Sequence, residues 1–226
     1  MKSKRITIIC GHYGSGKTTF SINYALYLRN QTSKDIYIAD LDVVNPYFRS
    51  REHFDYLKDK NIKVIGSYLP QSGADLPAVS AEVYTLFDNK NIIGIVDMGG
   101  NSAGSLSFAT FRDNVDIEET DIIFILNANR EENSTLEFAL GHFNSIESTL
   151  GLNITGIVNN THLMNDTTIE DINKGELISS ELSKEKNIPV KFTCINMDFF
   201  DNNPNIKTKY DLFLIGYDIK TVTNII

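Results

Sequence analysis

The sequence contains few cysteines and few histidines. Cys10 and Cys194 are its only cysteines, and its four histidines are scattered along 226 residues. No Cys-x-x-Cys pair occurs, so the sequence shows neither a disulfide framework nor the ligand spacing of a zinc site. Unpaired cysteines are typical of proteins in a reducing compartment, and we therefore expect a cytoplasmic protein.

The sequence also lacks long apolar runs and an excess of positive charge. No run approaches the roughly 18 apolar residues that span a bilayer, so we expect no integral membrane segment. The apolar run after Lys2, Lys4 and Arg5 is too short for a signal peptide. The net charge of −8 argues against nucleic acid or an anionic membrane as a partner, since both attract clustered basic residues. At this length the chain can bury one core, and we expect a single domain over residues 1–226.

A glycine-rich stretch near the start of the chain carries the strongest functional signal. The apolar run Ile6–Cys10 leads into Gly-His-Tyr-Gly-Ser-Gly-Lys-Thr, and a helical pattern follows. This spacing is that of a phosphate-binding loop, in which backbone N–H groups and the start of a helix hold phosphate oxygens. Lys17 is expected against the β- and γ-phosphates as a catalytic residue, and the hydroxyl of Thr18 is expected to ligate Mg²⁺. The predicted nucleotide-binding residues here are Gly11, His12, Tyr13, Gly14, Ser15, Gly16, Lys17, Thr18 and Thr19.

Short apolar segments alternate with helical segments along the whole chain. Strands are predicted over 6–10, 36–39, 62–65, 92–96, 122–126, 154–158 and 189–193, and helices after the glycine-rich stretch and over 49–59, 75–88, 103–111, 134–150 and 167–186. The last two helices are predicted to begin with capping boxes at Ser134 and Thr167. This alternation predicts an α/β fold, a three-layer αβα sandwich with a mainly parallel central sheet. The tail 210–226 is either a final strand or a helix at the sheet edge.

Acidic residues follow two of the predicted strands at their carboxyl ends, where ligands bind in parallel sheets. Asp97 has the setting of the carboxylate that holds Mg²⁺ beside a phosphate loop. Asp40 and Asp42 lie two residues apart, so only one of them can face the metal while the chain stays extended. One is expected to hold the water shell of Mg²⁺ and the other to orient the attacking water, or one of them is merely solvated.

The residues expected near the base favour adenine over guanine. Guanine is read by Asn-Lys-x-Asp, whose carboxylate accepts from the base, and neither Leu126–Arg130 nor Val158–His162 contains such an Asp. Asn159 or Asn160 is expected to bind adenine through its amide, or else to be an ordinary turn residue. ATP and Mg²⁺ are therefore the expected cofactors.

The phosphate loop, the Asp-Leu-Asp beginning at Asp40 and the Asp-Met-Gly-Gly beginning at Asp97 resemble the MinD/ParA/CobQ-CobB nucleotide-binding family of the SIMIBI class. This resemblance implies a Mg-ATP-dependent switch that dimerises face to face around ATP, with an Asp of the Asp40/Asp42 pair positioning the attacking water. Members with the deviant loop carry a lysine at its second position, where this chain has His12. The loop is closer in form to that of metallochaperone GTPases for nickel enzymes.

Four kinds of function agree with these features. The first is an ATPase, slow on its own, that acts as a switch on a partner protein. The second is an ATP-dependent small-molecule kinase or ligase, like dethiobiotin synthetase or cobyrinate amidase, with an acceptor pocket formed by residues 45–51 and 70–77. The others are a metallochaperone-like NTPase and a regulatory module without chemistry. Fold alone does not choose among them.

Overall fold

The described residues form one open sheet of eight parallel strands. The computed structural model describes residues 4–41, 51–66, 81–100, 108 and 110–216. The strand order is β3-β2-β4-β1-β5-β6-β7-β8, and every neighbouring pair is parallel. The strands are β1 (Ile6–Cys10), β2 (Ile36–Asp40), β3 (Ile62–Gly66), β4 (Ile93–Asp97), β5 (Thr120–Leu126), β6 (Gly156–Asn159), β7 (Val190–Asn196) and β8 (Leu212–Ile215).

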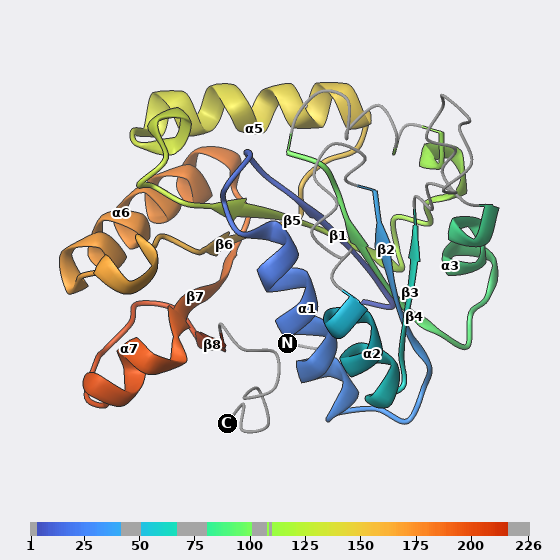
Figure 1. Ribbon diagram of the computed structural model, residues 1–226. Coiled ribbons are helices and arrows are strands. Elements are labelled where there is room, and N and C mark those ends of the chain that lie inside the picture. The colour runs from blue at the N-terminus through green and yellow to red at the C-terminus, as the bar shows by residue number, and fades with distance from the viewer. Residues whose placement is uncertain (1–3, 42–50, 67–80, 101–107, 109, 217–226) are drawn as a thin grey trace, which may run out of the picture.

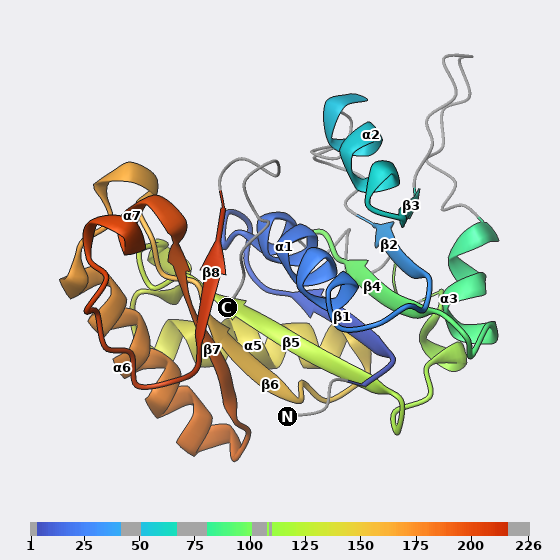
Figure 2. The ribbon, with the colours of Figure 1, turned by 90° about the horizontal axis from the view of Figure 1, so that it is seen from below.

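Helices cover both faces of the sheet (Figure 1). Helices α1 (Lys17–Arg29) and α2 (Arg51–Asp59) pack on one face, and α3 (Tyr84–Asp88), α5 (Leu136–Leu150) and α6 (Ile169–Lys186) pack on the other. Figure 2 shows the sheet between α1 and α2 on one side and α5 and α6 on the other. Successive strand residues enter opposite cores, so Ile8 packs toward α5 while Ile9 packs toward α1. The predicted three-layer α/β fold is confirmed.

Two helix starts differ from the prediction by one residue. Thr135, not Ser134, caps α5, and Thr168 with Asp171, not Thr167 with Glu170, forms the capping box of α6. In both cases a short 3₁₀ helix precedes the cap, η4 (Glu131–Asn133) and η5 (Met164–Asp166). The hydroxyls of Ser134 and Thr167 instead donate to the carbonyl groups of Glu131 and Met164 in those turns.

The remaining differences lie near the chain end and in segments with gaps. Part of the tail forms β8, which pairs with β7 at the sheet edge, and α7 (Met197–Asn202) follows β7 in a stretch with no predicted element. A 3₁₀ helix η2 (Ala81–Val83) precedes α3, and another, η3 (Arg112–Asn114), precedes β5. The predicted start of the 75–88 helix and most of the 103–111 helix lie outside the described residues. Among the helices that the structure describes, none has the length and apolar character needed to cross a membrane.

Phe213 of β8 packs against α1 through aromatic contacts. Its ring lies 5.2 Å from that of Phe20, 5.7 Å from that of Tyr27 and 5.3 Å from that of Phe192, and its side chain is buried. Phe20 and Tyr24 of α1 are thus buried core residues, and Tyr27 packs against the same core. Helix α1 begins at the predicted phosphate loop, so this cluster also supports the sheet edge at which that loop lies.

We expect Phe213→Ala to destabilise the fold by about 3–5 kcal/mol, since it removes a fully buried ring and leaves a cavity. Urea unfolding at neutral pH measures the change. Phe138→Ala is the matched control, because that ring is 53% exposed and its removal should change stability by less than about 0.5 kcal/mol. Equal losses in the two variants would contradict the role given to Phe213.

Candidate functional site

The glycine-rich stretch forms a tight loop between β1 and α1. Gly11, Gly14 and Gly16 have φ values of 142°, 73° and 85°, which side chains rarely tolerate. Helix α1 starts directly after Gly16, with no side-chain cap and no acidic residue in its first turn. Its first N–H groups therefore point into the loop without an internal acceptor. This is the geometry that binds phosphate at a helix N-terminus.

Lys17, Thr18 and Asp97 come together beside this loop. Lys17 Nζ donates to the carbonyl of His12 at 3.0 Å, and the Lys17 side chain is buried. The hydroxyl of Thr18 donates to Oδ2 of Asp97, the last residue of β4, at 2.6 Å. A hydroxyl and a carboxylate held together beside a phosphate site are the oxygen donors that Mg²⁺ prefers, so these residues fit the predicted metal.

The two other predicted carboxylates are placed differently. Asp40 ends β2 and is the register partner of Asp97 on β4, so the two residues lie side by side on neighbouring strands. Its side chain is half-buried. Asp42 lies outside the described residues, and the assignment of separate roles to Asp40 and Asp42 stays a prediction.

The segment after β4 lies directly against the phosphate loop. A Cβ atom placed on Gly100 would lie 2.6 Å from Nζ of Lys17 and 2.6 Å from the backbone nitrogen of Tyr13. Only glycine permits so close an approach. The chain following Asp97 therefore contacts the loop residues that are expected to hold the terminal phosphates.

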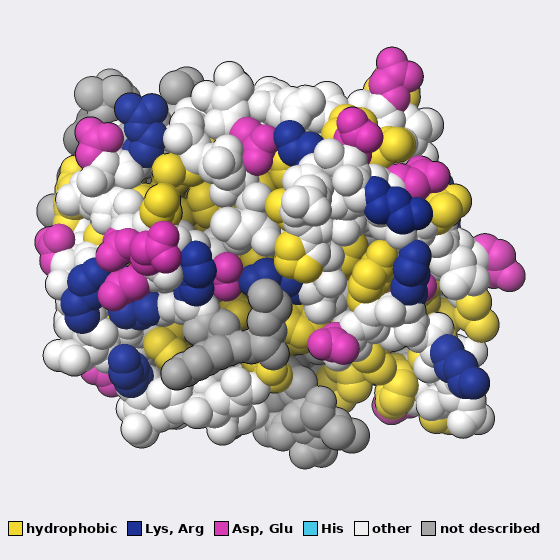
Figure 3. Space-filling view, turned by 180° about the vertical axis from the view of Figure 1, so that it is seen from behind, with side chains coloured by type: hydrophobic (Ala, Val, Ile, Leu, Met, Phe, Trp, Pro, Cys, Tyr) yellow, Lys and Arg dark blue, Asp and Glu magenta, His cyan; other side chains and the backbone are white. Residues whose placement is uncertain are grey.

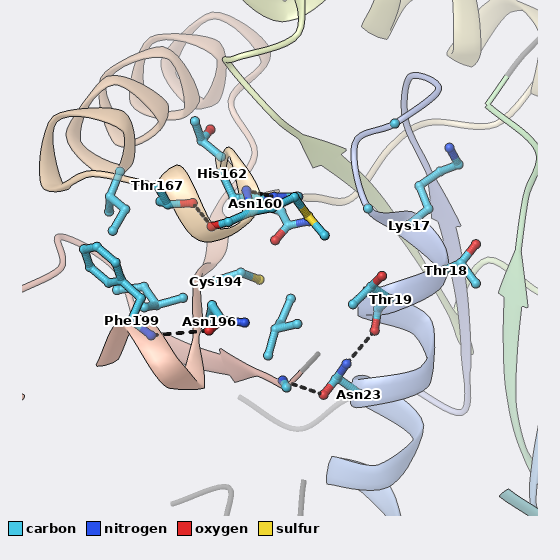
Figure 4. Close-up of a pocket in the computed structure, with 18 of the residues that line it drawn as sticks. Lys17, Thr18, Thr19, Asn23, Asn160, His162, Thr167, Cys194, Asn196 and Phe199 are labelled. Atoms are coloured by element: carbon cyan, nitrogen blue, oxygen red, sulfur yellow. Dashed lines mark hydrogen bonds between the residues drawn. The ribbon is translucent and has the colours of Figure 1, made fainter. Parts of the chain in front are cut away.

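A cavity of about 310 Å³ opens from the phosphate loop along the carboxyl ends of β6, β7 and β8 (Figure 4). Three asparagines from different elements, Asn23, Asn160 and Asn196, line it. Among the described residues of the lining, none is Asp or Glu. The apolar part of the wall consists of Ile22, Met164, Ile172, Cys194, Ile195, Phe199 and Ile215. The cavity thus combines a phosphate-binding end with a mostly apolar wall that carries a few amides, as sites for nucleosides do.

The structure separates the two candidate asparagines after β6. Asn160 lines the cavity, and its Nδ2 donates to the carbonyl of Ser15 at 2.7 Å. Asn159 is buried, with its Nδ2 donating to the carbonyl of Ile172 and its Oδ1 accepting from the N–H of Thr161. Asn159 is not in the lining, because its amide is used to fix the loop to α6. Asn160 is the residue of the pair that is placed to meet a ligand.

His12 turns toward α5 rather than into the cavity. Its Nδ1 lies 3.6 Å from Oε2 of Glu132, and its ring lies edge-on to that of His142 at 4.9 Å between centroids. Burial lowers the pKa of His142 from its usual 6.5 to about 4, and the charges of His12 and Lys17 add to this effect. His142 is therefore neutral in the folded protein at pH 7.

This histidine makes folding sensitive to acid. Below pH 6.5 the unfolded chain takes up a proton at His142 that the folded chain refuses until about pH 4, so stability falls as the pH drops through that interval. We expect His142→Gln to lose less stability than the wild type between pH 7 and pH 5 in urea unfolding. The same loss in both proteins would show that His142 does not contribute.

Two further residues of the site have no role in the sequence-based prediction. Arg130, just after β5, donates through Nε to the carbonyl of Gly14 at 3.0 Å, and His162, just after β6, lines the same cavity. Their one sequence signal is that each follows a predicted strand end closely. Side-chain direction in such loops depends on tertiary packing, which a single sequence does not reveal.

Comparison with known proteins supports the fold. No family model and no curated protein matches the sequence. Among solved structures, the chain is similar to FtsY from Thermotoga maritima, with a TM-score of 0.57 and 18% identity over 86% of this chain and 62% of that one. It is also similar to chloroplast FtsY from Physcomitrella patens, with a TM-score of 0.57 and 16% identity over 85% and 59% of the two chains. A third similar structure is the signal recognition particle 54 kDa protein of Aeropyrum pernix in complex with GDP, with a TM-score of 0.55 and 18% identity over 85% and 41%.

These neighbours belong to the SIMIBI class of P-loop NTPases. The chain spans 62% or less of the length of each. At such identities the similarity concerns the fold, which is that of an α/β P-loop NTPase. The similarity does not show membership of the MinD/ParA family. The signal recognition particle 54 kDa protein was solved with the guanine nucleotide GDP.

Proposed function

We propose that the chain binds Mg-ATP, hydrolyses it slowly and acts as a nucleotide-dependent switch on a protein partner. The observation that carries this proposal is the Thr18–Asp97 pair at 2.6 Å, set beside a phosphate loop that opens into a nucleoside-sized cavity. Each part is needed for a Mg-nucleotide, and the fold places them at one edge of the sheet.

The proposed chemistry assigns one task to each group. The N–H groups of the loop and of the first turn of α1 bind phosphate oxygens, and Lys17 stabilises the negative charge that grows during phosphoryl transfer. Thr18 and Asp97 would hold Mg²⁺, with Asp40 beside them. When bound, the ion neutralises the charge of the β- and γ-phosphates. Asp40 or Asp42 orients the attacking water and accepts its proton.

The amides of the cavity support ATP as the nucleotide. Oδ1 of Asn196 accepts from the N–H groups of Asp198 and Phe199, so its Nδ2 turns into the cavity, as Figure 4 shows. Such a donor suits the ring nitrogens of adenine. Guanine presents N1–H and N2–H groups that are best met by a carboxylate, and the described lining holds none. The guanine nucleotide in a neighbour of 18% identity does not bear on this choice.

The position of Gly100 supports a switch. Because Gly100 lies against Lys17 and Tyr13, the presence or loss of a terminal phosphate can change the position of the chain just after β4. Tyr13 and Met164, both at the cavity, are 61% and 53% exposed, and their side chains are suited to contact with a partner protein. Over the face in Figure 3, Lys and Arg lie among Asp and Glu, which agrees with a protein partner rather than nucleic acid. A second copy of the chain, bound face to face around ATP, is one such partner.

Two measurements on the purified protein test this proposal. The first is phosphate release from ATP and from GTP with Mg²⁺, where we expect slow release that is faster with ATP. The second is mass by light scattering with Mg-ATP and with Mg-ADP, where a change of mass only with ATP supports a dimeric switch. ATP binding by a constant monomer, with ATP consumption stimulated by a small molecule, would favour the kinase or ligase. Tight ATP binding without any turnover would favour a regulatory module.

A further inference from the structure

Arg130 lies flat on the phosphate loop. Its Nε donates to the carbonyl of Gly14, and a Cβ atom on Gly14 would lie only 2.9 Å from its Cζ. The side chain is exposed and lines the cavity. Within the described part of the chain, its two Nη nitrogens form no hydrogen bond. The planar group is therefore held in place by one bond while its other donors stay available.

His162 presents a second donor beside Arg130. Its Nδ1 lies 3.3 Å from the N–H of Met164, which donates to it, so the proton of the neutral ring belongs on Nε2. Nε2 lies 3.5 Å from the position of a Cβ on Gly16. Figure 4 shows His162 next to Asn160, across the cavity from Thr18 and Thr19. Burial, and then the positive charge of Arg130, lowers the pKa of His162.

The positive charges of the cavity lining gather at the phosphate loop. Lys17 and Arg130 are the two Lys or Arg side chains among its described residues, and both contact the phosphate loop. Arg130 is held beside a phosphate site whose described lining contains no carboxylate, and such a cation favours a polyanion. The apolar end of the cavity, near Ile215 and Phe199, offers no such charge.

We infer that Arg130 and His162 form a second phosphate-binding element, which contacts the phosphates of the nucleotide from the loops after β5 and β6. The phosphate loop binds through backbone N–H groups, whereas this element adds a guanidinium and an imidazole N–H. Arg130 also holds Gly14, so phosphate binding and the shape of the loop depend on the same side chain. This inference rests on the proposed nucleotide binding and adds two specific ligand contacts to it.

Calorimetric affinities for ATP, ADP, AMP and adenosine test the inference in the wild type and in Arg130→Ala, Arg130→Lys and His162→Gln. We expect Arg130→Ala to weaken ATP and ADP about 10- to 100-fold, because charge-assisted hydrogen bonds are lost, and adenosine by less than about 2-fold. Arg130→Lys keeps the charge and should lose less than Arg130→Ala. His162→Gln should weaken ATP about 3- to 10-fold, the value of one neutral hydrogen bond.

Salt and a matched surface arginine separate a phosphate contact from mere support of the loop. ATP affinity should depend less steeply on salt concentration in Arg130→Ala than in the wild type, since one cation is gone. Arg112→Ala is the control, because the Arg112 side chain is 49% exposed beside Asp113 and does not line the cavity. This variant should bind ATP as tightly as the wild type. Urea unfolding checks that each variant is folded.

Two outcomes would overturn the inference. Arg130→Ala could bind ATP within about 2-fold of the wild type, or it could lose ATP and adenosine affinity equally, which would make Arg130 a structural residue only. A wild type that binds no nucleotide would refute the proposed function and the inference together. Wild-type ATP binding that Arg130→Ala retains in full would refute the inference alone.

Discussion

Lys17→Ala is expected to lower the rate of ATP hydrolysis at least about 100-fold, because it removes the buried ammonium group that meets the terminal phosphates. Nζ of Lys17 is held 3.0 Å from the carbonyl of His12, so it is fixed in place before any nucleotide arrives. Phosphate release under saturating Mg-ATP measures the effect. Lys184→Ala is the matched control, since Lys184 is exposed in the last turn of α6, and it should keep wild-type turnover. Near-normal turnover in Lys17→Ala would place the chemistry elsewhere.

Asp97→Asn is expected to lower hydrolysis about 100-fold and to raise the Mg²⁺ concentration needed for half-maximal rate. The substitution keeps the size of the side chain and removes the negative charge that favours a hard cation beside Thr18. The measurement is ATP turnover across a Mg²⁺ titration. Asp113→Asn is the control, because its side chain is 93% exposed in η3 and does not line the cavity. An unchanged Mg²⁺ requirement in Asp97→Asn would exclude Asp97 as a metal-holding residue.

The sequence predicts most of the fold because its signals are local. Alternating apolar and helical segments identify the strands from β1 to β7, and the spacing of glycines with Lys17 and Thr18 defines the phosphate loop. The prediction fails by one residue at Ser134 and Thr167, since nothing in the sequence shows that preceding 3₁₀ turns use these hydroxyls. The sequence does not decide between strand and helix for β8, because its packing depends on contacts of Phe213 with α1, which is distant in the sequence.

The candidate site is predictable where backbone position suffices and not where side-chain direction decides. Thr18 and Asp97 follow from strand ends, and the structure places them in contact. Asn159 and Asn160 are adjacent and face opposite ways, so only the fold shows that Asn160 enters the cavity. Arg130 contacts Gly14 across 116 positions of sequence. A single sequence carries no signal for such a contact.

The loop position of His12 bears on how the chain assembles. The MinD/ParA resemblance gives this position to a lysine that reaches a partner's site. Here the ring instead meets Glu132 and His142 of its own chain, both on the α5 side of the loop. If the chain dimerises around ATP, the contact to the partner's phosphates is made by another group.

The proposed function requires the cavity beside the phosphate loop to bind Mg-ATP. Its most direct test is a calorimetric titration of the wild-type protein with ATP and, separately, with GTP, each with Mg²⁺ present. We expect one ATP to bind per chain, at least about 10-fold tighter than GTP, a difference of about 1.4 kcal/mol that amides in place of a carboxylate can supply. Tighter binding of GTP would contradict the proposed preference for adenine, and absence of binding by both nucleotides would show that the cavity is not a nucleotide site.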